Sequence, residues 1–261
     1  MTRIYAFVNQ KGGVGKTTTA INLGSYLATN NQQVLLVDLD AQGNATACLG
    51  VERKNINAGT YNLLINPSTR LHANTMRSEK LGISLIPSSP ALAGAEVELV
   101  NEPDRANRLK QALSQASRYD YVLIDCPPSL GLLTLNGLVA AQAVVVPVQC
   151  EYLALEGLGQ LLETINRIQV AFNFDLQIRG VLMTMYDSRL KLSQQVVDEV
   201  RLHFPDKVFQ VVIPRNVRLA EAPSHGQPIS KYAPDSAGAN AYAALATEIL
   251  SGDTPHNIVL S

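Results

Sequence analysis

A glycine-rich turn between an apolar run and a helical pattern constrains this chain more than any other feature. Residues 10–18 read QKGGVGKTT; the apolar run IYAFV precedes them at 4–8, and a helical pattern follows over 16–29. Glycines let successive backbone N–H groups point at phosphate oxygens, and the N-terminus of the following helix adds its positive end. This order of strand, loop and helix predicts a phosphate-binding loop.

The rest of the chain alternates short β-branched runs with longer helical patterns, which predicts an α/β fold. We expect strands at 4–8, 34–38, 83–86, 121–125, 143–148, 178–183 and 208–213. We expect helices at 16–29, 104–117, 130–141, 154–171, 190–203 and 237–250. Several strands are apolar on both faces, as is typical of covered parallel sheets. We therefore predict a doubly wound, mostly parallel sheet with helices on both faces; residues 50–80 lack a clear period, and no element is predicted there.

Composition favours one domain in a reducing compartment. The 261 residues are 46% hydrophobic with a net charge of −1, so the chain can bury a large core and has no overall basic field. Cys48, Cys126 and Cys150 lie far apart, which argues against a disulfide framework or a cysteine-based zinc site and favours the cytoplasm. No linker or repeat interrupts the pattern. We expect a single P-loop ATPase domain over residues 1–252 and a frayed tail at 253–261.

The phosphate-binding loop contains two lysines, of which only one has an evident role. Lys16 is placed to reach the β- and γ-phosphates of a nucleotide, and the Thr17 hydroxyl is placed to ligate Mg²⁺. The standard pattern G-x-x-x-x-G-K-[ST] requires glycine at position 10, where this chain has Gln10 followed by Lys11. Taken alone, Lys11 reads as a solvated surface lysine.

The stretch from Lys11 to Thr17 matches K-G-G-x-G-K-[ST], the deviant Walker A motif, and here the chain resembles the ParA/Soj family of partitioning ATPases. That family belongs to a larger group with MinD and nitrogenase iron protein, and the resemblance covers roughly residues 3–250. It implies that Lys11 crosses a dimer interface and contacts the phosphates held by the partner, so that two ATP molecules are sandwiched between two chains. The implied phosphate contacts are Lys11, Gly12, Gly13, Val14, Gly15, Lys16, Thr17 and Thr18.

Three aspartates follow predicted strands. Asp38 and Asp40 end the run VLLVDLD and share a face if that strand continues, while Asp125 ends YVLID. The resemblance implies that Asp38 helps to hold the water shell of Mg²⁺, that Asp40 positions or activates the attacking water, and that Asp125 binds Mg²⁺ through water. The implied metal set is Thr17, Asp38 and Asp125, and the implied catalytic set is Lys11, Lys16 and Asp40.

The C-terminal half supplies the implied adenine and DNA contacts. By resemblance, Thr184 and Met185 together with Pro214, Arg215 and Asn216 surround the adenine, although relatives such as MinD carry asparagine where this chain has Thr184. Between residues 179 and 231, eight Arg and Lys face five Asp and Glu, a net charge of +3. The ATP-bound dimers of the family bind DNA without sequence preference, and Arg189 and Arg218 stand in matching motifs. Scattered surface arginines and lysines are also common in proteins without this function.

These features predict an ATP-dependent dimerisation switch. It would hydrolyse ATP with Mg²⁺, weakly on its own, bind DNA non-specifically as the ATP dimer, and segregate chromosome or plasmid DNA over the nucleoid with a ParB-like partner. The alternative is a MinD-like positioning ATPase for a membrane or protein cargo. The end of the chain, GDTPHNIVLS, lacks the lysines and arginines of a membrane-binding helix, so we expect no membrane contact. We expect no DNA-binding domain before Lys11, and an iron–sulfur protein is disfavoured because Cys126 and Cys150 are expected to be small buried residues.

Overall fold

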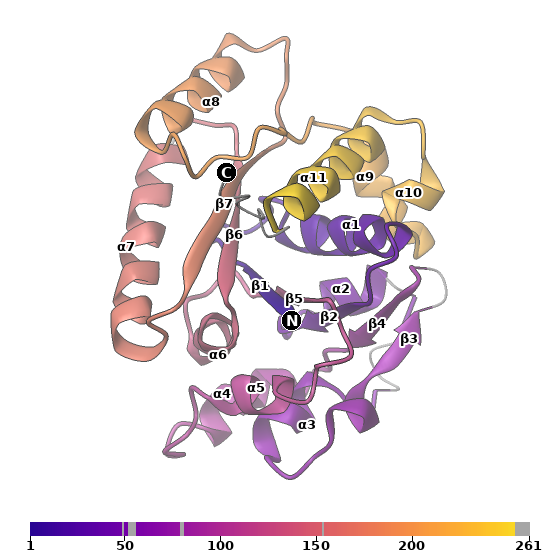
Figure 1. Cartoon of the computed structure of the whole chain (residues 1–261), viewed down its shortest axis with the longest axis vertical. Coiled ribbons are helices and arrows are strands. Elements are labelled where there is room, and N and C mark those ends of the chain that lie inside the picture. Colours follow the sequence, from indigo (N-terminus) through magenta and orange to yellow (C-terminus); the bar gives the residue numbers. More distant parts are fainter. Residues whose placement is uncertain (49, 52–55, 79–80, 153, 254–261) are drawn as a thin grey trace, which may run out of the picture.

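The computed structural model describes residues 1–253 apart from 49, 52–55, 79–80 and 153 (Figure 1). Its centre is a seven-stranded sheet in the order β3-β4-β2-β5-β1-β6-β7. The strands are β1 (Arg3–Phe7), β2 (Val34–Asp38), β3 (Met76–Ser78), β4 (Ile83–Ile86), β5 (Tyr121–Asp125), β6 (Ala143–Gln149) and β7 (Gln177–Thr184). Neighbouring strands are parallel except β3, which pairs antiparallel with β4. The predicted doubly wound, mostly parallel sheet is confirmed.

Helices cover both faces of the sheet (Figure 1). Residues of β2 alternate between two core clusters: Leu35 packs with α3 to α7 on one face, and Leu36 packs with α1 and α11 on the other. This alternation explains why the strands are apolar on both faces. The helices are α1 (Lys16–Thr29), α2 (Asn44–Cys48), α3 (Thr60–Ile65), α4 (Leu92–Glu98), α5 (Arg108–Leu113), α6 (Leu132–Ala140), α7 (Ala154–Phe172), α8 (Lys191–His203), α9 (Val217–Glu221), α10 (Ile229–Tyr232) and α11 (Ala237–Asp253).

The predicted strand at 208–213 is wrong. Val208 forms an isolated bridge with Val181 of β7, and the N–H groups of residues 209 and 213 donate to the carbonyls of Val181 and Met183 at 3.0 and 2.8 Å, but no continuous ladder forms. The carboxylate of Glu248 on α11 accepts the backbone N–H groups of residues 210 and 211 at 2.7 and 3.0 Å. A side chain therefore occupies two of the donors that a continuous ladder would use, and the segment lies beside the second half of β7 without forming a strand of the sheet.

Other boundaries differ by smaller amounts. The helix expected over 104–117 is shorter, Arg108–Leu113, because turns flank it on both sides. The last helix continues to Asp253, so this residue belongs to α11 and not to the expected tail; the remainder of that tail, 254–261, lies outside the described residues. The described part of 50–80 contains α3, a 3-10 turn at Leu71–Asn74 and β3.

The parallel strands bring their carboxyl ends to one edge of the sheet, where the loops after β1, β2, β5 and β6 meet. The register places Asp38 at the end of β2 directly beside Asp125 at the end of β5. Phe7, the last residue of β1, is also paired with Asp125, and the glycine-rich loop follows β1. The fold thus gathers the predicted phosphate loop and two of the three predicted aspartates at one place.

Candidate nucleotide site

The glycine-rich loop has the open, left-handed backbone that its glycines permit. Gly13 has φ of 77° and Gly15 has φ of 93°, conformations that side chains with a Cβ rarely adopt. No heavy atom lies within 4 Å of the position that a Cβ would take on Gly12 or Gly13. From β7, the buried Thr184 hydroxyl donates to the Val14 carbonyl at 2.9 Å and fixes the middle of the loop. The loop is therefore anchored at its base and open towards a ligand.

Lys16, the first residue of α1, lies inside this loop. Its Nζ donates to the backbone carbonyls of Asn9 at 3.0 Å and Lys11 at 3.1 Å, and the residue is only 7% exposed. Burial lowers the pKa of Lys16, and the nearby carboxylates of Asp125 and Asp40 oppose that shift. An ammonium group held at the centre of a loop of N–H groups is suited to a polyphosphate.

Asp125 is fully buried, and among the described residues only one of its two oxygens is hydrogen-bonded. Its Oδ2 accepts the Thr17 hydroxyl at 2.7 Å, while Oδ1 has no hydrogen-bond partner in the part of the chain that the structure describes. Burial, followed by the charge of Asp38, raises the pKa of Asp125 well above its ordinary range. An unpaired buried carboxylate oxygen next to a hydroxyl fits a hard divalent cation such as Mg²⁺.

The described residues contain no cluster of three or more His, Cys, Asp or Glu side chains that could hold a metal. Mg²⁺ in nucleotide sites commonly uses one or two protein groups together with phosphate oxygens and water. Thr17 and Asp125 supply such groups here, so the residues present fit the ion.

Asp38 and Asp40 are tied to each other and to the loop after β2. The Asp38 carboxylate accepts the Thr46 N–H and hydroxyl at 2.8 and 2.6 Å and the Asp40 N–H at 3.2 Å. Burial raises the pKa of Asp38 to about 6, against the opposing effect of the Thr46 hydrogen bonds. Asp40 is less enclosed, and its Oδ1 accepts the Gln42 N–H at 2.8 Å. Three protein donors already use most of the capacity of Asp38, whereas the carboxylate of Asp40 keeps accepting positions.

Lys11 turns away from the loop to which it belongs. Its side chain is 55% exposed, and its ammonium forms an ion pair with Glu151 in the connection between β6 and α7. A cavity of about 470 Å³ adjoins this pair and is lined also by Glu156 and Gly157 of α7. The two lysines of the loop therefore occupy different environments: Lys16 is inside the loop, and Lys11 is at the surface beside α7.

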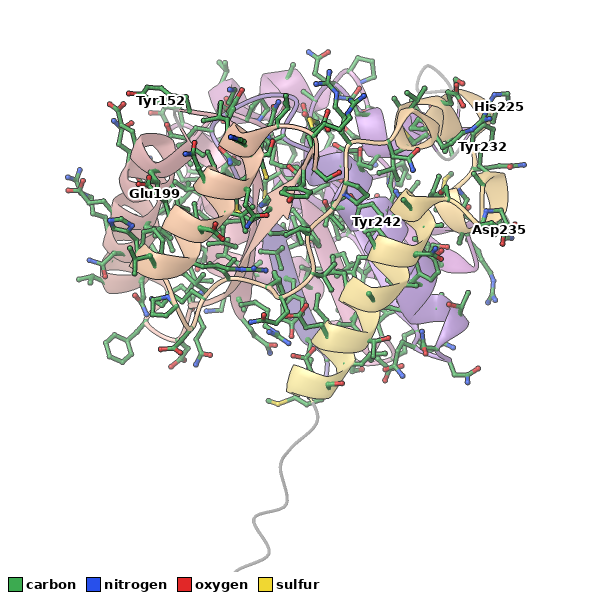
Figure 2. All side chains as sticks on the ribbon, turned by 90° about the horizontal axis from the view of Figure 1, so that it is seen from above. Tyr152, Glu199, His225, Tyr232, Asp235 and Tyr242 are labelled. Carbon is green, nitrogen blue, oxygen red and sulfur yellow. The ribbon has the colours of Figure 1, made fainter. Side chains whose placement is uncertain are left out.

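A second cavity, of about 340 Å³, lies beside the start of α1. Its lining includes all five residues predicted to surround the adenine, and it reaches Gly15 and Thr18 of the phosphate loop. The five are Thr184, Met185, Pro214, Arg215 and Asn216. Met185 has φ of 53°, an uncommon conformation for a residue with a side chain, and one that is enriched at binding sites. Tyr242 of α11, labelled in Figure 2, also lines the cavity and hydrogen-bonds Thr19 at 3.1 Å.

The predicted DNA-contacting arginines are exposed, and each is paired with an acidic neighbour. Arg189 is 84% exposed and bonds Asp187 at 2.6 and 2.9 Å, which lowers the pKa of Asp187 to about 2. Arg218 of α9 bonds Glu221 at 2.9 Å. The charged residues that give the net charge of +3 between 179 and 231 do not all form one surface. Arg179 lies in the first half of β7 and bonds the Asp253 carboxylate at 3.0 Å.

Cys126 and Cys150 are buried, as predicted. Burial raises the pKa of the Cys150 thiol to about 11 and that of Cys126 further. Both thiols are therefore protonated near neutral pH, whereas cluster ligation requires accessible thiolates.

Sequence reasoning missed several residues that shape the site. Asn9 holds the phosphate loop, Thr46 and Ser88 hold the aspartates, and Glu151 pairs with Lys11. The sequence predicts Thr184 beside the adenine, but it does not predict the hydrogen bond of Thr184 to the phosphate loop. Single Ser, Thr, Asn or Glu residues have no distinguishing pattern in one sequence. Their roles depend on which loops the sheet brings together.

Comparisons with known proteins agree with this geometry. A family described as the AAA domain matches residues 2–178. The crystal structure of cobyrinic acid a,c-diamide synthase from Mycobacterium smegmatis, with bound ADP and magnesium, is similar with a TM-score of 0.84 and 41% identity. The match covers 96% of this chain and 94% of that chain.

Two relatives of known name are more similar in sequence. The sporulation initiation inhibitor protein Soj of Bacillus subtilis (strain 168) is 53% identical, with 95% of this chain and 98% of that protein covered. The chromosome partitioning protein ParA of Myxococcus xanthus (strain DK1622) is 51% identical, with 97% of this chain and 89% of that protein covered. Identity at this level extends over nearly the full length, so the chain belongs to the ParA/Soj family of chromosome-partitioning ATPases, within the MinD/ParA superfamily.

Proposed function

We propose that this ATPase is a dimerisation switch that binds DNA without sequence preference in its ATP-bound dimeric form and segregates chromosome or plasmid DNA with a ParB-like partner. The observation that carries the proposal is the separation of the two loop lysines. Lys16 is buried in its own loop, whereas Lys11 is exposed beside α7 and is not engaged with that loop. A lysine in this position is available to the phosphates of a second chain.

The nucleotide site would be built as follows. The loop from Gly12 to Thr18 would cradle the phosphates, with Lys16 at the β- and γ-phosphates. Thr17 and Asp125 would hold Mg²⁺, with Asp38 further from the ion, and the ion would neutralise charge on the phosphates. Asp40 would accept a proton from the attacking water.

The cavity beside α1 would take the adenine. Met185 and Asn216 lie in its lining, as do Pro214 and Arg215. The partly apolar lining suits a flat heteroaromatic ring, and the cavity is continuous with the phosphate loop through Gly15. Residues 1–252 would act as one ATPase domain, which also includes Asp253 because α11 ends at this residue.

Dimerisation would switch on DNA binding because two copies of the same basic residues act together. One chain offers Arg189 and Arg218 in exposed positions, and a dimer doubles the number of phosphate contacts. Affinity rises steeply with the number of contacts, and it falls with salt. Association with the nucleoid would follow from this binding, and release would follow hydrolysis.

The experiment compares Lys11→Ala with Lys16→Ala, each in an Asp40→Ala background that slows hydrolysis. Lys110→Ala, an exposed lysine on α5, is the matched control. ATP affinity is measured with a fluorescent ATP analogue, and dimerisation is measured by sedimentation velocity. Binding to a labelled DNA duplex is then measured with ATP, with ADP and without nucleotide, at two salt concentrations.

We expect Lys16→Ala to lose ATP binding and Lys11→Ala to keep it while losing both the dimer and DNA retention. Lys110→Ala should behave as the Asp40→Ala protein does. A Lys11→Ala protein that dimerises with unchanged affinity refutes the role of Lys11 in trans. DNA binding that is equal with ATP, with ADP and without nucleotide refutes the switch.

A further inference from the structure

We infer that Thr46 and Ser88 are positioning residues for ATP hydrolysis, because they close a buried ring of hydrogen bonds that fixes Asp40. The inference rests on the proposed role of Asp40 as the acceptor of the proton from water. It adds two residues that are not among the lining residues of the adenine cavity and that no motif identifies.

The ring begins at the Asp38 carboxylate and passes through two hydroxyl side chains. The Thr46 hydroxyl donates to Asp38 at 2.6 Å and accepts the Ser88 N–H at 2.9 Å. The Ser88 hydroxyl then donates to the Asp40 carbonyl at 2.7 Å. The Asp40 N–H returns to the Asp38 carboxylate at 3.2 Å and closes the ring.

The ring constrains the backbone of Asp40 from both sides. Its N–H is held by Asp38 and its carbonyl by Ser88, so rotation of either adjoining peptide breaks a hydrogen bond. Asp38, Thr46 and Ser88 are fully buried, and water cannot replace the lost partners. The side chain of Asp40 stays at the rim, 8% exposed, where it can meet a water molecule.

Three separate segments are joined by this ring. Thr46 lies on α2, Ser88 follows β4, and Asp38 ends β2 with Asp40 two residues after it. Thr60 at the start of α3 adds a further hydrogen bond to the Asp38 carbonyl at 2.7 Å. A loop held from three directions is preorganised, and correct placement of the group that accepts a proton from the attacking water contributes a large part of a hydrolytic rate.

Each hydroxyl in the ring has a chemical requirement that can be tested. Thr46 must both donate and accept, which serine can do and valine cannot. Ser88 uses its N–H for Thr46 and its hydroxyl for Asp40, so Ser88→Ala removes only the hold on Asp40 and leaves the rest of the ring in place.

The test uses Ser88→Ala, Thr46→Val and Thr46→Ser in the full chain. Ser25→Ala is the matched control, because Ser25 is also buried and its hydroxyl bonds Ser230 at 2.9 Å, on α1 and away from Asp40. Hydrolysis is measured in single turnovers with radiolabelled ATP. The affinity for a fluorescent ATP analogue, ATP-dependent dimerisation and the Tm are measured on the same proteins.

We expect Ser88→Ala and Thr46→Val to lower the hydrolysis rate by about tenfold while ATP affinity and dimerisation change by less than about twofold. Thr46→Ser should recover the rate to within about threefold of the unmodified protein. Ser25→Ala should hydrolyse ATP at the unmodified rate. If Thr46→Val does not fold, Ser88→Ala and Thr46→Ser decide the matter.

The inference is overturned if Ser88→Ala hydrolyses ATP at a rate within about twofold of the unmodified protein. It is also overturned if the hydrolysis rate falls only as much as the ATP affinity does. Asp40→Ala separates this failure from failure of the proposed function. If Asp40→Ala hydrolyses ATP normally, the proposed role of Asp40 is wrong. If Asp40→Ala is inactive and Ser88→Ala is normal, only the positioning role is wrong.

Discussion

Two lysines five positions apart in one loop have opposite surroundings, and helix geometry explains the difference. Lys16 is the first residue of α1, and helical side chains point back towards the N-terminus. Its ammonium therefore folds over the loop and meets the carbonyls of Asn9 and Lys11. Lys11 precedes the helix, is not constrained in this way, and reaches Glu151 across the surface.

Asp125 gives a prediction at this scale, because its environment favours ligand binding over stability. Asp125→Asn keeps the shape of a buried carboxylate whose pKa is raised by burial and by Asp38. We expect the nucleotide-free protein to gain about 1 kcal/mol in the free energy of unfolding at neutral pH, and to lose magnesium-dependent ATP affinity. Urea unfolding and calorimetric titration of ATP with and without magnesium measure the two effects.

The stability that Asp125→Asn gains over the unmodified protein should decrease as the pH falls. Folding raises the pKa of Asp125, so ionisation of this group costs stability above the carboxyl pKa of the unfolded chain, and the cost disappears as pH falls towards that value. The advantage of Asp125→Asn should therefore shrink between pH 8 and pH 5. An advantage that grows on acidification contradicts the assignment.

The sequence predicts the residues whose chemistry is set by local pattern and misses those set by the arrangement of loops. The loop from Lys11 to Thr18 and the strand-end residue Asp125 follow from the motif and from the rule for parallel strands. Thr46 lies eight residues after Asp38, and Ser88 lies 48 residues after Asp40. The adjacency of β2 and β4 in the sheet brings Ser88 to Asp40, and the turn from β2 into α2 brings Thr46 back to Asp38.

At the scale of elements, the segment 208–213 shows why an apolar run is not always a strand. The residues VFQVVI have strand composition, yet Phe209 packs its ring against Gly180 of β7, where a Cβ would lie 2.5 Å from that ring. Glu248 of α11 takes two of the backbone donors. The competing partner is 38 residues away in the chain, and no local periodicity reveals it.

The end of α11 is fixed by Asp253 and gives a second prediction. Its carboxylate accepts the hydroxyls of Tyr5 at 2.7 Å and Tyr121 at 2.9 Å, and it also pairs with Arg179 at 3.0 Å. Asp253→Ala leaves two buried tyrosine hydroxyls and a half-buried arginine without this partner, so we expect a loss of about 2–4 kcal/mol in the free energy of unfolding. Urea unfolding checks this, with the exposed Asp235→Ala as control. Equal stability of the two variants contradicts the prediction.

The short helix α9 gives a third prediction, about DNA. Arg218 pairs with Glu221, whose carboxylate also accepts the Tyr232 hydroxyl at 3.0 Å. Phosphate must compete with this carboxylate for Arg218. We expect Glu221→Gln to raise the DNA affinity of the ATP-bound dimer about threefold, and Arg218→Glu to lower it at least tenfold while sparing dimerisation.

Asp235→Asn is the charge control for this pair of variants. Asp235 lies at the same edge of the molecule as Tyr232 and His225 in Figure 2, and it lines a cavity with Arg218, but its carboxylate has no ion pair among the described residues. Fluorescence anisotropy with a labelled duplex gives the three affinities. If Asp235→Asn raises affinity as much as Glu221→Gln does, general charge and not release of Arg218 explains the gain.

At the scale of the whole molecule, the groups proposed to act on a second chain or on DNA share one feature. Lys11, Arg189 and Arg218 are each paired with a carboxylate of their own chain. Exposed ion pairs of this kind are individually weak, so a phosphate can displace the carboxylate. In a dimer, phosphate replaces the carboxylate of each ion pair twice, once in each chain. A small change in the strength of one ion pair therefore changes the dimerisation equilibrium more than it changes the stability of the single chain.

Glu151 makes this exchange measurable. In the single chain it holds Lys11, which must leave it to reach the phosphates of a partner. Glu151→Gln removes the charge and keeps the shape, so we expect the ATP-dependent dimer to form at a protein concentration about three- to tenfold lower. Sedimentation velocity over a concentration series with ATP, in the Asp40→Ala background, gives the dimer affinity. Glu156→Gln is the control, since Glu156 is an exposed acid of α7 in the same cavity lining. A weaker dimer in Glu151→Gln, with Glu156→Gln unchanged, would mean that Glu151 stabilises the assembled pair and does not restrain Lys11 before assembly.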